Sequence, residues 1–405
     1  MEWKEVTLGE ISSKIGDGLH GTPKYDDEGP YYFINGNNLN CGKIIIKDDT
    51  KRVGIDEFVK NQKELNEQTL LVSINGTIGN VAKYNNEPCI LGKSACYINV
   101  IKEVDKEFIY YVLTSANFKR NITNEATGTT IKNVSLKQMR EYKFNIPCNI
   151  ADQRRIASIL TSLDRKIELN NKINADLEEM AQAIFKNWFV DFEPFKDGKF
   201  VDSELGMIPE GWRVGTIGDI VEFQNGFAFS SKDFSENGEY KIITIKSVQD
   251  GCLVTEGSSK VTEYPTKMPA YCKLQSGDIL LSLTGNVGRC CLVTETNLLL
   301  NQRVAKIKAK ECYDNSFSYA LFRLKETKEL LISISRGTAQ ANLSPVEASK
   351  LPMVIPSEDA RKKFSMISGS IMDKITSIHI ENRTLSTLRD TLLPRLMSGE
   401  LEVPE

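Results

Sequence analysis

The chain contains two copies of one sequence pattern, and this internal repeat constrains its fold more than any other feature. Segment 3–11 (WKEVTLGEI) recurs as segment 212–220 (WRVGTIGDI), an offset of 209 residues. Segment 73–79 (SINGTIG) recurs at the same offset as 282–288 (SLTGNVG). Further matches keep this register: Gly128-Thr129, Asn133, Ser135 and Pro147 recur as Gly337-Thr338, Asn342, Ser344 and Pro356. One offset held across separate blocks is typical of a duplicated domain.

A long helical pattern follows each copy, over residues 152–189 and 360–393. Apolar residues in both segments recur at alternating steps of four and three, which is typical of a coiled-coil seam. The first seam comprises Ile156, Leu160, Leu163, Ile167, Asn170, Asn174, Leu177, Ala181, Ile184 and Trp188. The second comprises Ile367, Ile371, Ile375, Ile378, Asn382, Leu385 and Leu392. Two such seams in one chain predict an antiparallel coiled coil.

Asparagines interrupt both seams, and a buried Asn in a coiled coil fixes register at some cost in stability. We therefore expect Asn170, Asn174 and Asn382 to set the register. An ordinary core helix is the alternative explanation of an apolar stripe. Proline is not tolerated in a helix interior, so Pro394 predicts that the second helix stops near Leu393.

Within each copy, short β-branched or aromatic runs alternate with turn residues, as in 42–46 and 240–245, and these runs predict strands. Residues near 105–121 and 314–333 are expected to be helical. The predicted fold class is α+β, with two tandem mixed domains over 1–150 and 196–357. The two long helices, over 151–195 and 358–405 with the C-terminal tail, separate them.

Composition is ordinary for a globular protein, with 405 residues, 40% hydrophobic and 26% charged. No apolar run is long enough for a membrane span, and the first residues do not resemble a signal peptide. Nine cysteines lie without a Cys-x-x-Cys pair, so we expect a cytoplasmic protein without a disulfide framework. The net charge of −3 does not exclude a DNA partner, because the basic residues can be segregated onto one face.

The sequence lacks the motifs that are typical of catalytic, metal-binding and cofactor-binding sites. Only two histidines exist, His20 and His379, so neither a His-based triad nor a His-rich metal site is expected. Segment 87–94 (EPCILGKS) has Glu87 where a phosphate-binding P-loop needs Gly. No amino-methyltransferase tetrapeptide or dinucleotide-binding glycine pattern is present. We expect no catalytic residue, no metal and no directly bound cofactor.

Polar, basic and aromatic loop residues are candidates for reading DNA. Asn and Gln pair bidentately with adenine, and Arg or Lys with guanine, while Lys93 and Arg303 are expected to touch phosphates. The predicted DNA-binding residues of the first copy are Lys24, Tyr25, Asn35, Asn37, Asn38, Lys93, Lys132 and Asn133. Those of the second copy are Lys232, Lys246, Gln302, Arg303, Arg336, Gln340 and Asn342. For any single residue of this set, the alternative interpretation is a solvated loop residue that does not contact DNA.

Several motifs resemble those of the specificity subunits of type I restriction-modification systems. They are the duplicated opening, segment 70–79 and its second copy, the run 153–160 (QRRIASIL) continuing to 163–170 (LDRKIELN), and the ending 388–400 (LRDTLLPRLMSGE). The resemblance covers nearly the whole chain. It implies that the two domains are target recognition domains, each reading half of a split site in double-stranded DNA, and that the helices form a spacer.

The resemblance further implies two methyltransferase subunits as partners, which carry S-adenosylmethionine and methylate adenine, and a motor nuclease subunit that can join them. Segment 185–192 (FKNWFVDF) has no second counterpart. We expect its aromatic side chains to pack the helix end against a globular domain rather than to bind a partner.

Two other classes of protein compete with this interpretation. A coiled-coil adaptor that binds only proteins would have no salt-dependent DNA affinity. A self-sufficient nuclease or methyltransferase would need the cofactor motifs and histidines that this sequence lacks.

Overall fold

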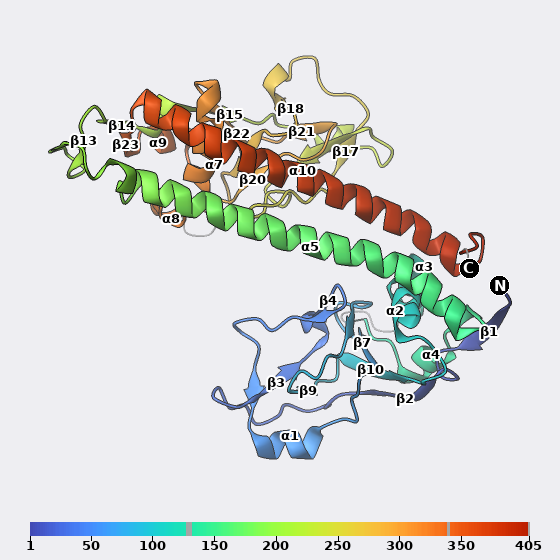
Figure 1. Ribbon diagram of the computed structural model, residues 1–405. Helices are drawn as coiled ribbons and strands as arrows, with labels where there is room; N and C mark the ends of the chain where they lie inside the picture. Colours follow the sequence, from blue (N-terminus) through green and yellow to red (C-terminus); the bar gives the residue numbers. More distant parts are fainter. Residues whose placement is uncertain (127–131, 338–340, 404–405) are drawn as a thin grey trace. The chain divides into compact units, whose positions relative to one another are not determined.

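The computed structural model describes residues 1–126, 132–337 and 341–403. It divides into two compact units, unit 1 with residues 1–166 and 385–405, and unit 2 with residues 167–384. Each unit contains one globular copy and part of both long helices, α5 (Ile150–Phe189) and α10 (Glu358–Met397). Figure 1 labels both long helices, α5 and α10.

The main sheet of unit 1 is antiparallel, in the order β2-β10-β7-β8, with bounds Ser12–Asp17, Ala95–Val100, Thr69–Ser73 and Val81–Lys83. A second sheet has the order β6-β3-β9, with bounds Arg52–Val53, Tyr31–Ile34 and Cys89–Leu91. In that sheet β3 and β9 run parallel, so both strands end at the same edge. Two small pairs complete the unit: β1 (Trp3–Thr7) with β11 (Lys143–Pro147), and β4 (Leu39–Asn40) with β5 (Lys43–Ile44).

Unit 2 repeats this plan. Its main sheet has the order β15-β22-β19-β20, with bounds Val221–Asn225, Val304–Ala309, Ile279–Ser282 and Cys290–Leu292. The second sheet has the order β17-β16-β21-β18, with bounds Lys260–Val261, Tyr240–Ile243, Leu298–Leu300 and Lys273–Leu274. The small pairs are β14 (Arg213–Thr216) with β23 (Pro352–Ile355), and β12 (Phe200–Val201) with β13 (Ile208–Pro209).

The 209-residue offset found in the sequence holds for the structure. β10 begins at Ala95 and β22 at Val304, and both are six residues long. α2 (Lys106–Thr114) and α7 (Asn315–Arg323) are related in the same way, as are β3 and β16. The copies differ where α1 (Ile55–Asn61) has no helical counterpart except the short turn η4 (Ala270–Cys272). The scaffold is therefore duplicated, and the copies differ in the connections, in the additional strand β18 of unit 2 and in the small pairs β4-β5 and β12-β13.

The predicted helical regions are each broken in two. α2 is followed by α3 (Ala116–Glu125), and α7 by α8 (Lys325–Ser333). Ser115 explains the break in unit 1, because its extended backbone ends α2 while its hydroxyl caps α3 by accepting a 3.2 Å bond from Phe118 N–H. Two shorter helices, α4 (Leu136–Glu141) and α9 (Pro345–Ser349), precede the last strand of each copy. Their N-caps are Ser135 and Ser344, again 209 residues apart.

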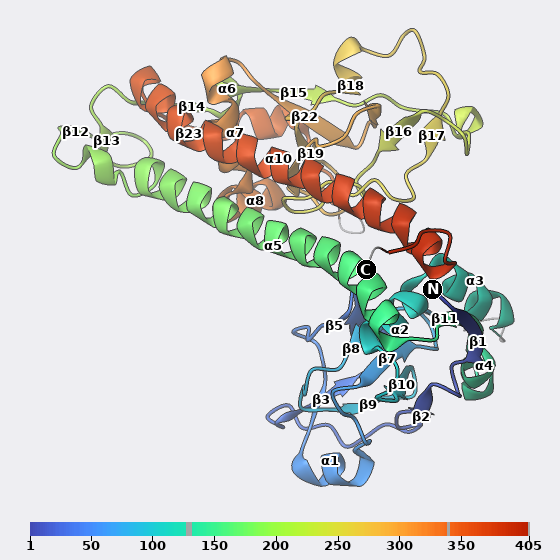
Figure 2. The same cartoon turned by 45° about the vertical axis from the view of Figure 1, so that its right-hand side comes forward.

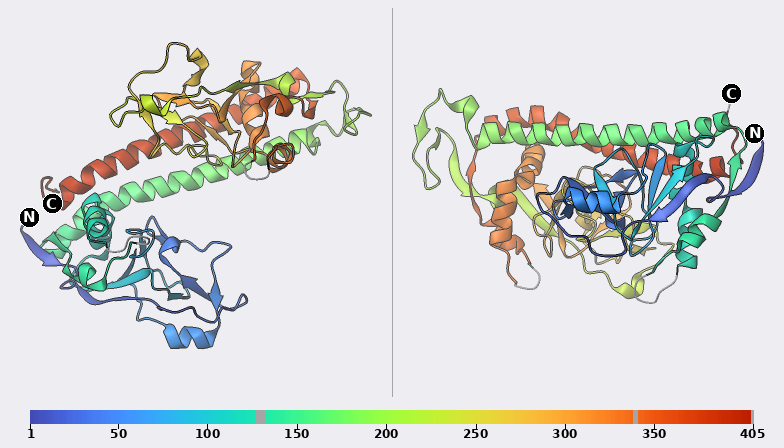
Figure 3. Two further views of the ribbon diagram at one scale, coloured as in Figure 1. Left: turned by 180° about the vertical axis from the view of Figure 1, so that it is seen from behind. Right: turned by 90° about the horizontal axis from the view of Figure 1, so that it is seen from below.

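Within unit 2 the two long helices lie side by side and run antiparallel (Figures 1 and 3). Asn170 near the start of this stretch of α5 contacts Asn382, and Phe185 near its end contacts Phe364. Unit 1 shows the same pairing, since Asp164 contacts Arg389 at 2.8 Å. The predicted α+β fold with an antiparallel pair of long helices is confirmed.

Two details of the helix prediction are wrong. Pro394 lies inside α10, which continues to Met397. Only one helical hydrogen bond is lost so close to the end, and Leu393 and Leu396 are both buried in the core of unit 1. Ile367 is 43% exposed, so it does not belong to the seam. Phe364 and Ser368 are buried instead, because this part of α10 also packs on α7, where Ser368 donates to Ser316 at 2.8 Å.

The aromatic residues of segment 185–192 pack as predicted. Phe185 and Phe189 lie 5.1 and 5.0 Å from Phe317 of α7, measured between ring centroids. Phe192 lies 5.4 Å from Trp212, the residue that opens the second copy. These contacts fix the end of α5 against the globular part of unit 2.

Candidate nucleic-acid interface

In unit 1, one end of the two sheets gathers most of the predicted DNA-binding residues. β3, β9 and β7 end there, and β10 begins there. Asn35 follows β3, Lys93 lies in the turn between β9 and β10, and Asn133 forms a bridge with Asn75 after β7. Ser94 joins these loops, because its hydroxyl contacts Asn35 and its carbonyl accepts from Ile74 N–H. Lys24 and Tyr25 lie apart from this set, with Tyr25 paired to Val53 beside the start of β3.

Exposure divides these residues into two groups. The side chains of Lys24, Tyr25, Asn37, Lys93 and Lys132 are exposed, and that of Tyr25 is 42% exposed. They are therefore accessible to a ligand.

Asn38 is part of the scaffold, and half-buried Asn35 lies beside it in the same turn. Asn38 is 4% exposed, and its amide nitrogen donates to Ile45 C=O at 3.0 Å and to the Thr50 hydroxyl at 3.2 Å. Its amide oxygen accepts from Asn35 N–H at 3.0 Å, which fixes the turn after β3. Asn35 in turn accepts from Ser94 at 2.9 Å. Asn38 is thus a structural residue, and its prediction as a base contact is set aside because every polar atom of its side chain is already used.

Unit 2 brings its candidates to the equivalent end of its sheets. Lys246 follows β16, and Gln302 and Arg303 form the turn between β21 and β22; all three are exposed. Arg336 and Asn342 form a two-bond backbone bridge, and Thr284 donates to the Asn342 side chain at 3.0 Å. Lys232 lies in the η3 turn (Ser231–Asp233), which is not in this group. Gln340 lies outside the described residues.

Two equivalent positions of the candidate loops carry different side chains in the two copies, whereas Asn133 and Asn342 are identical. Asn37 corresponds to Lys246, and Lys93 to Gln302, at the offset of 209. Because amide and ammonium groups recognise different base edges, the two surfaces have different hydrogen-bonding properties on the same scaffold.

Lys119 and Lys328 are also basic, lie at the same offset, and were absent from the sequence prediction. Both are in the second helix after the main sheet, α3 and α8. The repeat register alone would have found them.

A charged network attaches each long helix to its domain. In unit 2, Glu178 of α5 accepts from Tyr319 and lies 3.1 Å from Arg323, both on α7, while Arg323 also lies 3.3 Å from Asp250. Burial raises the pKa of the Tyr319 phenol well above its usual value, so Tyr319 remains a hydrogen-bond donor. In unit 1, Asp164 of α5 accepts from Tyr111 at 2.7 Å and from Arg389 of α10 at 2.8 Å. A carboxylate of α5 therefore binds a tyrosine of the globular part in each unit, together with an arginine of α7 in unit 2 and of α10 in unit 1.

The predicted register residues lie in the helix seam of unit 2. Asn170 donates to Asn382 at 2.8 Å and to Glu381 at 2.9 Å, and Asn382 donates to Asn171 at 2.8 Å. Asn174 is 5% exposed, and neither polar atom of its side chain has a hydrogen-bond partner among the described residues. The seam thus contains one satisfied asparagine pair and one unsatisfied asparagine.

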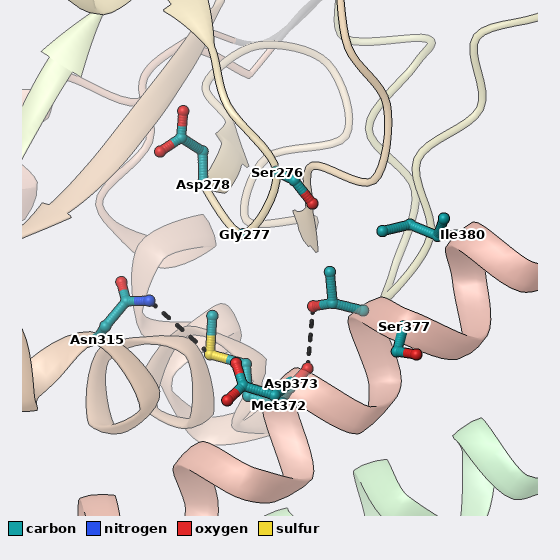
Figure 4. A pocket seen from close by; sticks show the side chains of 9 residues that line it. Ser276, Gly277, Asp278, Asn315, Met372, Asp373, Ser377 and Ile380 are labelled. Carbon is teal, nitrogen blue, oxygen red and sulfur yellow. Dashed lines mark hydrogen bonds between the residues drawn. The ribbon is translucent and has the colours of Figure 1, made fainter.

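A cavity of about 520 Å³ lies in unit 2 between α10, the start of α7 and the turn before β19 (Figure 4). Its lining is polar, with Asp278 and Asp373 as the charged residues. Asp278 is paired with Lys306 at 2.8 Å, and the Met372 sulfur lies 4.0 Å from the Asn315 amide. No Lys or Arg is among the lining residues, so the cavity lacks the positive charge with which a DNA-binding surface holds phosphates.

Within residues 1–126, 132–337 and 341–403, no three His, Cys, Asp or Glu side chains are grouped as a metal site would require. Over the same ranges, none of the helices has the length and apolar character needed to cross a membrane.

Comparison with protein families decides which family has this duplicated architecture. The model of the type I restriction modification DNA specificity domain matches residues 1–179 and again residues 209–389. The chain belongs to this family. The double match places one specificity domain in each copy of the repeat.

Relatives of this specificity-domain protein cover most of its length. It is 27% identical to the type I restriction enzyme MjaIX specificity subunit of Methanocaldococcus jannaschii, over 95% of this chain and 87% of the relative. It is 26% identical to the HindI specificity subunit of Haemophilus influenzae, over 73% and 77% of the two chains. The crystal structure of a type I S subunit from M. genitalium has the same fold, with a TM-score of 0.55, 19% identity and coverage of 98% and 96%.

Proposed function

We propose that this chain is the DNA-specificity subunit of a type I restriction-modification complex, which recognises a bipartite target and directs adenine methylation or restriction by partner subunits. The first target recognition domain comprises residues 1–150 and the second residues 196–357. Residues 151–195 and 358–405 supply the two spacer helices and the C-terminal tail. The chain itself is non-catalytic, and S-adenosylmethionine is carried by the methyltransferase subunits.

The observation that carries this proposal is a constant scaffold with variable loops. Most strands and helices of the two copies coincide at one offset, whereas the exposed residues at the ends of β3 and β9 differ from those at the ends of β16 and β21. A protein that reads two different half-sites needs this combination, because phosphates position a domain and base-edge contacts specify the sequence.

The residues proposed to contact DNA are exposed or lie in the same loops as exposed candidates. They are Lys24, Tyr25, Asn35, Asn37, Lys93, Lys132 and Asn133 in the first domain, and Lys232, Lys246, Gln302, Arg303, Arg336 and Asn342 in the second. Gln340 stays a prediction from sequence.

The partners proposed are two methyltransferase subunits and, for restriction, motor nuclease subunits. The long helices are the proposed docking surface, since each runs through both units and presents exposed apolar residues. Leu169, Met180, Ile380 and Leu388 are between 42% and 53% exposed, so these apolar side chains are available for a protein contact.

A binding experiment tests the function. The chain, its methyltransferase and the assembled complex are each titrated with a DNA library at several salt concentrations. We expect weak, sequence-independent binding by the chain alone and sequence-selective, salt-dependent binding by the complex. A coiled-coil adaptor would leave the DNA affinity of the methyltransferase unchanged. Methyl transfer or DNA cleavage by the isolated chain would contradict the non-catalytic assignment.

A further inference from the structure

Each domain has a glycine-rich hairpin at the end of its main sheet, and the two hairpins share one hydrogen-bond pattern. Residues 74–80 join β7 to β8, and residues 283–289 join β19 to β20. Gly76 N–H donates to Lys132 C=O at 3.3 Å, as Gly285 N–H does to Ala341 C=O at 2.9 Å. Gly79 N–H donates to Ser73 C=O at 2.9 Å, as Gly288 N–H does to Ser282 C=O at 3.0 Å. The conformation is retained although the side chains between the glycines differ.

The tip of each hairpin has free backbone donors. Gly76 and Gly285 both have φ of 73°, and Gly79 and Gly288 have φ of 88° and 81°, values that favour glycine. Thr77 and Asn286 at the tips are exposed. Among the described residues no acceptor contacts the backbone N–H groups of Thr77 or Asn286. Unused N–H groups in a turn form a concavity that attracts anions.

A lysine flanks each hairpin at the same place. A Cβ atom built on Gly79 would lie 3.3 Å from Lys119 Cγ, and one built on Gly288 would lie 3.0 Å from Lys328 Cγ. Lys119 is exposed and has no acidic partner among the described residues, whereas Lys328 pairs with Asp250. Exposed Lys132 and Arg336 border the segments that bond to the two hairpins. Each site therefore combines a free backbone amide with nearby basic side chains, of which Lys119 is unpaired among the described residues and Lys328 shares its charge with Asp250.

We propose that each hairpin, with its flanking lysine, binds a phosphate of the DNA backbone in the same way in both domains. This inference rests on the proposed function. Two of the positions in the proposed DNA-binding loops, 37 and 93, carry different residues in the second copy, Lys246 and Gln302, whereas the hairpin conformation and the lysine are the same in both copies. The sugar-phosphate backbone is the part of the DNA that is the same in both half-sites, so a retained contact is expected there. Thr77, Lys119, Asn286 and Lys328 would thus supply affinity without selecting sequence.

The test uses the assembled complex with its methyltransferase subunits and single variants of this chain. Lys119→Gln removes the free charge, and Thr77→Asp and Asn286→Asp place a carboxylate where the phosphate would bind. The control is Lys102→Gln, because Lys102 is exposed and follows β10 at the opposite end of the same sheet. Kd is measured for target and non-target duplexes from 0.05 to about 0.3 M salt, a range in which phosphate contacts change affinity strongly. Thermal unfolding and gel filtration check folding and assembly.

We expect Lys119→Gln to reduce the slope of log Kd against log salt by about 1 and to weaken binding by about eightfold at 0.1 M salt, since one phosphate contact contributes about 0.9 to that slope. Target and non-target DNA should be weakened equally, and the methylated sequence should not change. Both aspartate variants should weaken binding in the same uniform way, and Lys102→Gln should match the wild type.

Three results would overturn this inference while the proposed function stands: variants that bind like Lys102→Gln, variants that change the recognised sequence, or variants that fail to assemble with the methyltransferase. The last result would identify the hairpins as a protein contact. The proposed function itself would fail if the wild-type complex had no sequence preference, and that comparison is made in the same titration.

Discussion

Asn170 and Asn174 lie one helical turn apart in the same seam, and we predict that replacing them by leucine has opposite effects on stability. Asn174 is buried with both polar atoms unpartnered, so Asn174→Leu removes a desolvation cost of about 1–3 kcal/mol. Leucine also adds buried apolar surface of similar size to the amide it replaces. We expect unit 2 to become more stable by about 2 kcal/mol.

Asn170→Leu should destabilise the same unit by about 1–3 kcal/mol. The substitution leaves the Asn382 amide oxygen buried without the donor that now lies 2.8 Å away. Adding Asn382→Leu should recover most of this loss, because the remaining partners, Asn171 and Glu381, are exposed and are solvated once released. The second variant therefore acts as the matched control for the first.

Differential scanning calorimetry of the full chain measures these effects. For a unit of roughly 200 residues, 1 kcal/mol shifts Tm by about 2–4 °C, so Asn174→Leu should raise the Tm of its transition by about 4–8 °C. Asn170→Leu should lower it by a comparable amount. Equal destabilisation by the two single variants would refute the reasoning, since it would mean that the Asn174 amide makes a stabilising contact in solution.

Three further predictions concern register, spacing and thiol accessibility. Replacing Asn170, Asn174 and Asn382 together by leucine should raise Tm while loosening the helix register, which spin labels on α5 and α10 would show as a broadened distance distribution; an unchanged, narrow distribution would contradict the register role. Inserting one heptad into both long helices, roughly 10 Å of length, should lengthen the unread spacer of the target by a few base pairs or abolish binding, and an unchanged spacer would assign the spacing to the methyltransferase. Native protein should react with a thiol reagent at Cys41, Cys148, Cys252 and Cys312, but not at buried Cys89, Cys96, Cys272, Cys290 and Cys291; burial raises the pKa of Cys89 to about 12, and rapid labelling of this thiol would contradict the packing.

The repeat made the scaffold predictable from sequence. Its offset predicted two copies of one mixed α and β domain, and periodicity located both long helices. The interruption at Ser115 was missed because the apolar pattern continues across it, and only the capping bond to Phe118 reveals two helices. Pro394 was misjudged because its local cost is smaller than the gain from burying Leu393 and Leu396, which is a tertiary effect.

The candidate site was less predictable. Residue type identified polar loop residues, but Asn37 and Asn38 are neighbours with opposite exposures, and no sequence pattern distinguishes them. Asn38 is buried by bonds to Ile45 and Thr50, which come from a turn that forms only in the folded chain. Lys119 and Lys328 could have been predicted from the sequence. They keep the repeat register in a region where the neighbouring residues diverge.

The central claim is that the two copies read separate half-sites for a partner methyltransferase, and domain exchange tests it most directly. Residues 1–150 are replaced by the matching domain of a relative, and the chain is expressed with its methyltransferase in cells without other adenine methylation. Methylation-aware sequencing then gives the modified motif for the original and the exchanged chain. We expect a split motif in which the exchange alters one half and leaves the other half and the spacer unchanged. A motif altered in both halves, or methylation that does not depend on this chain, would contradict it.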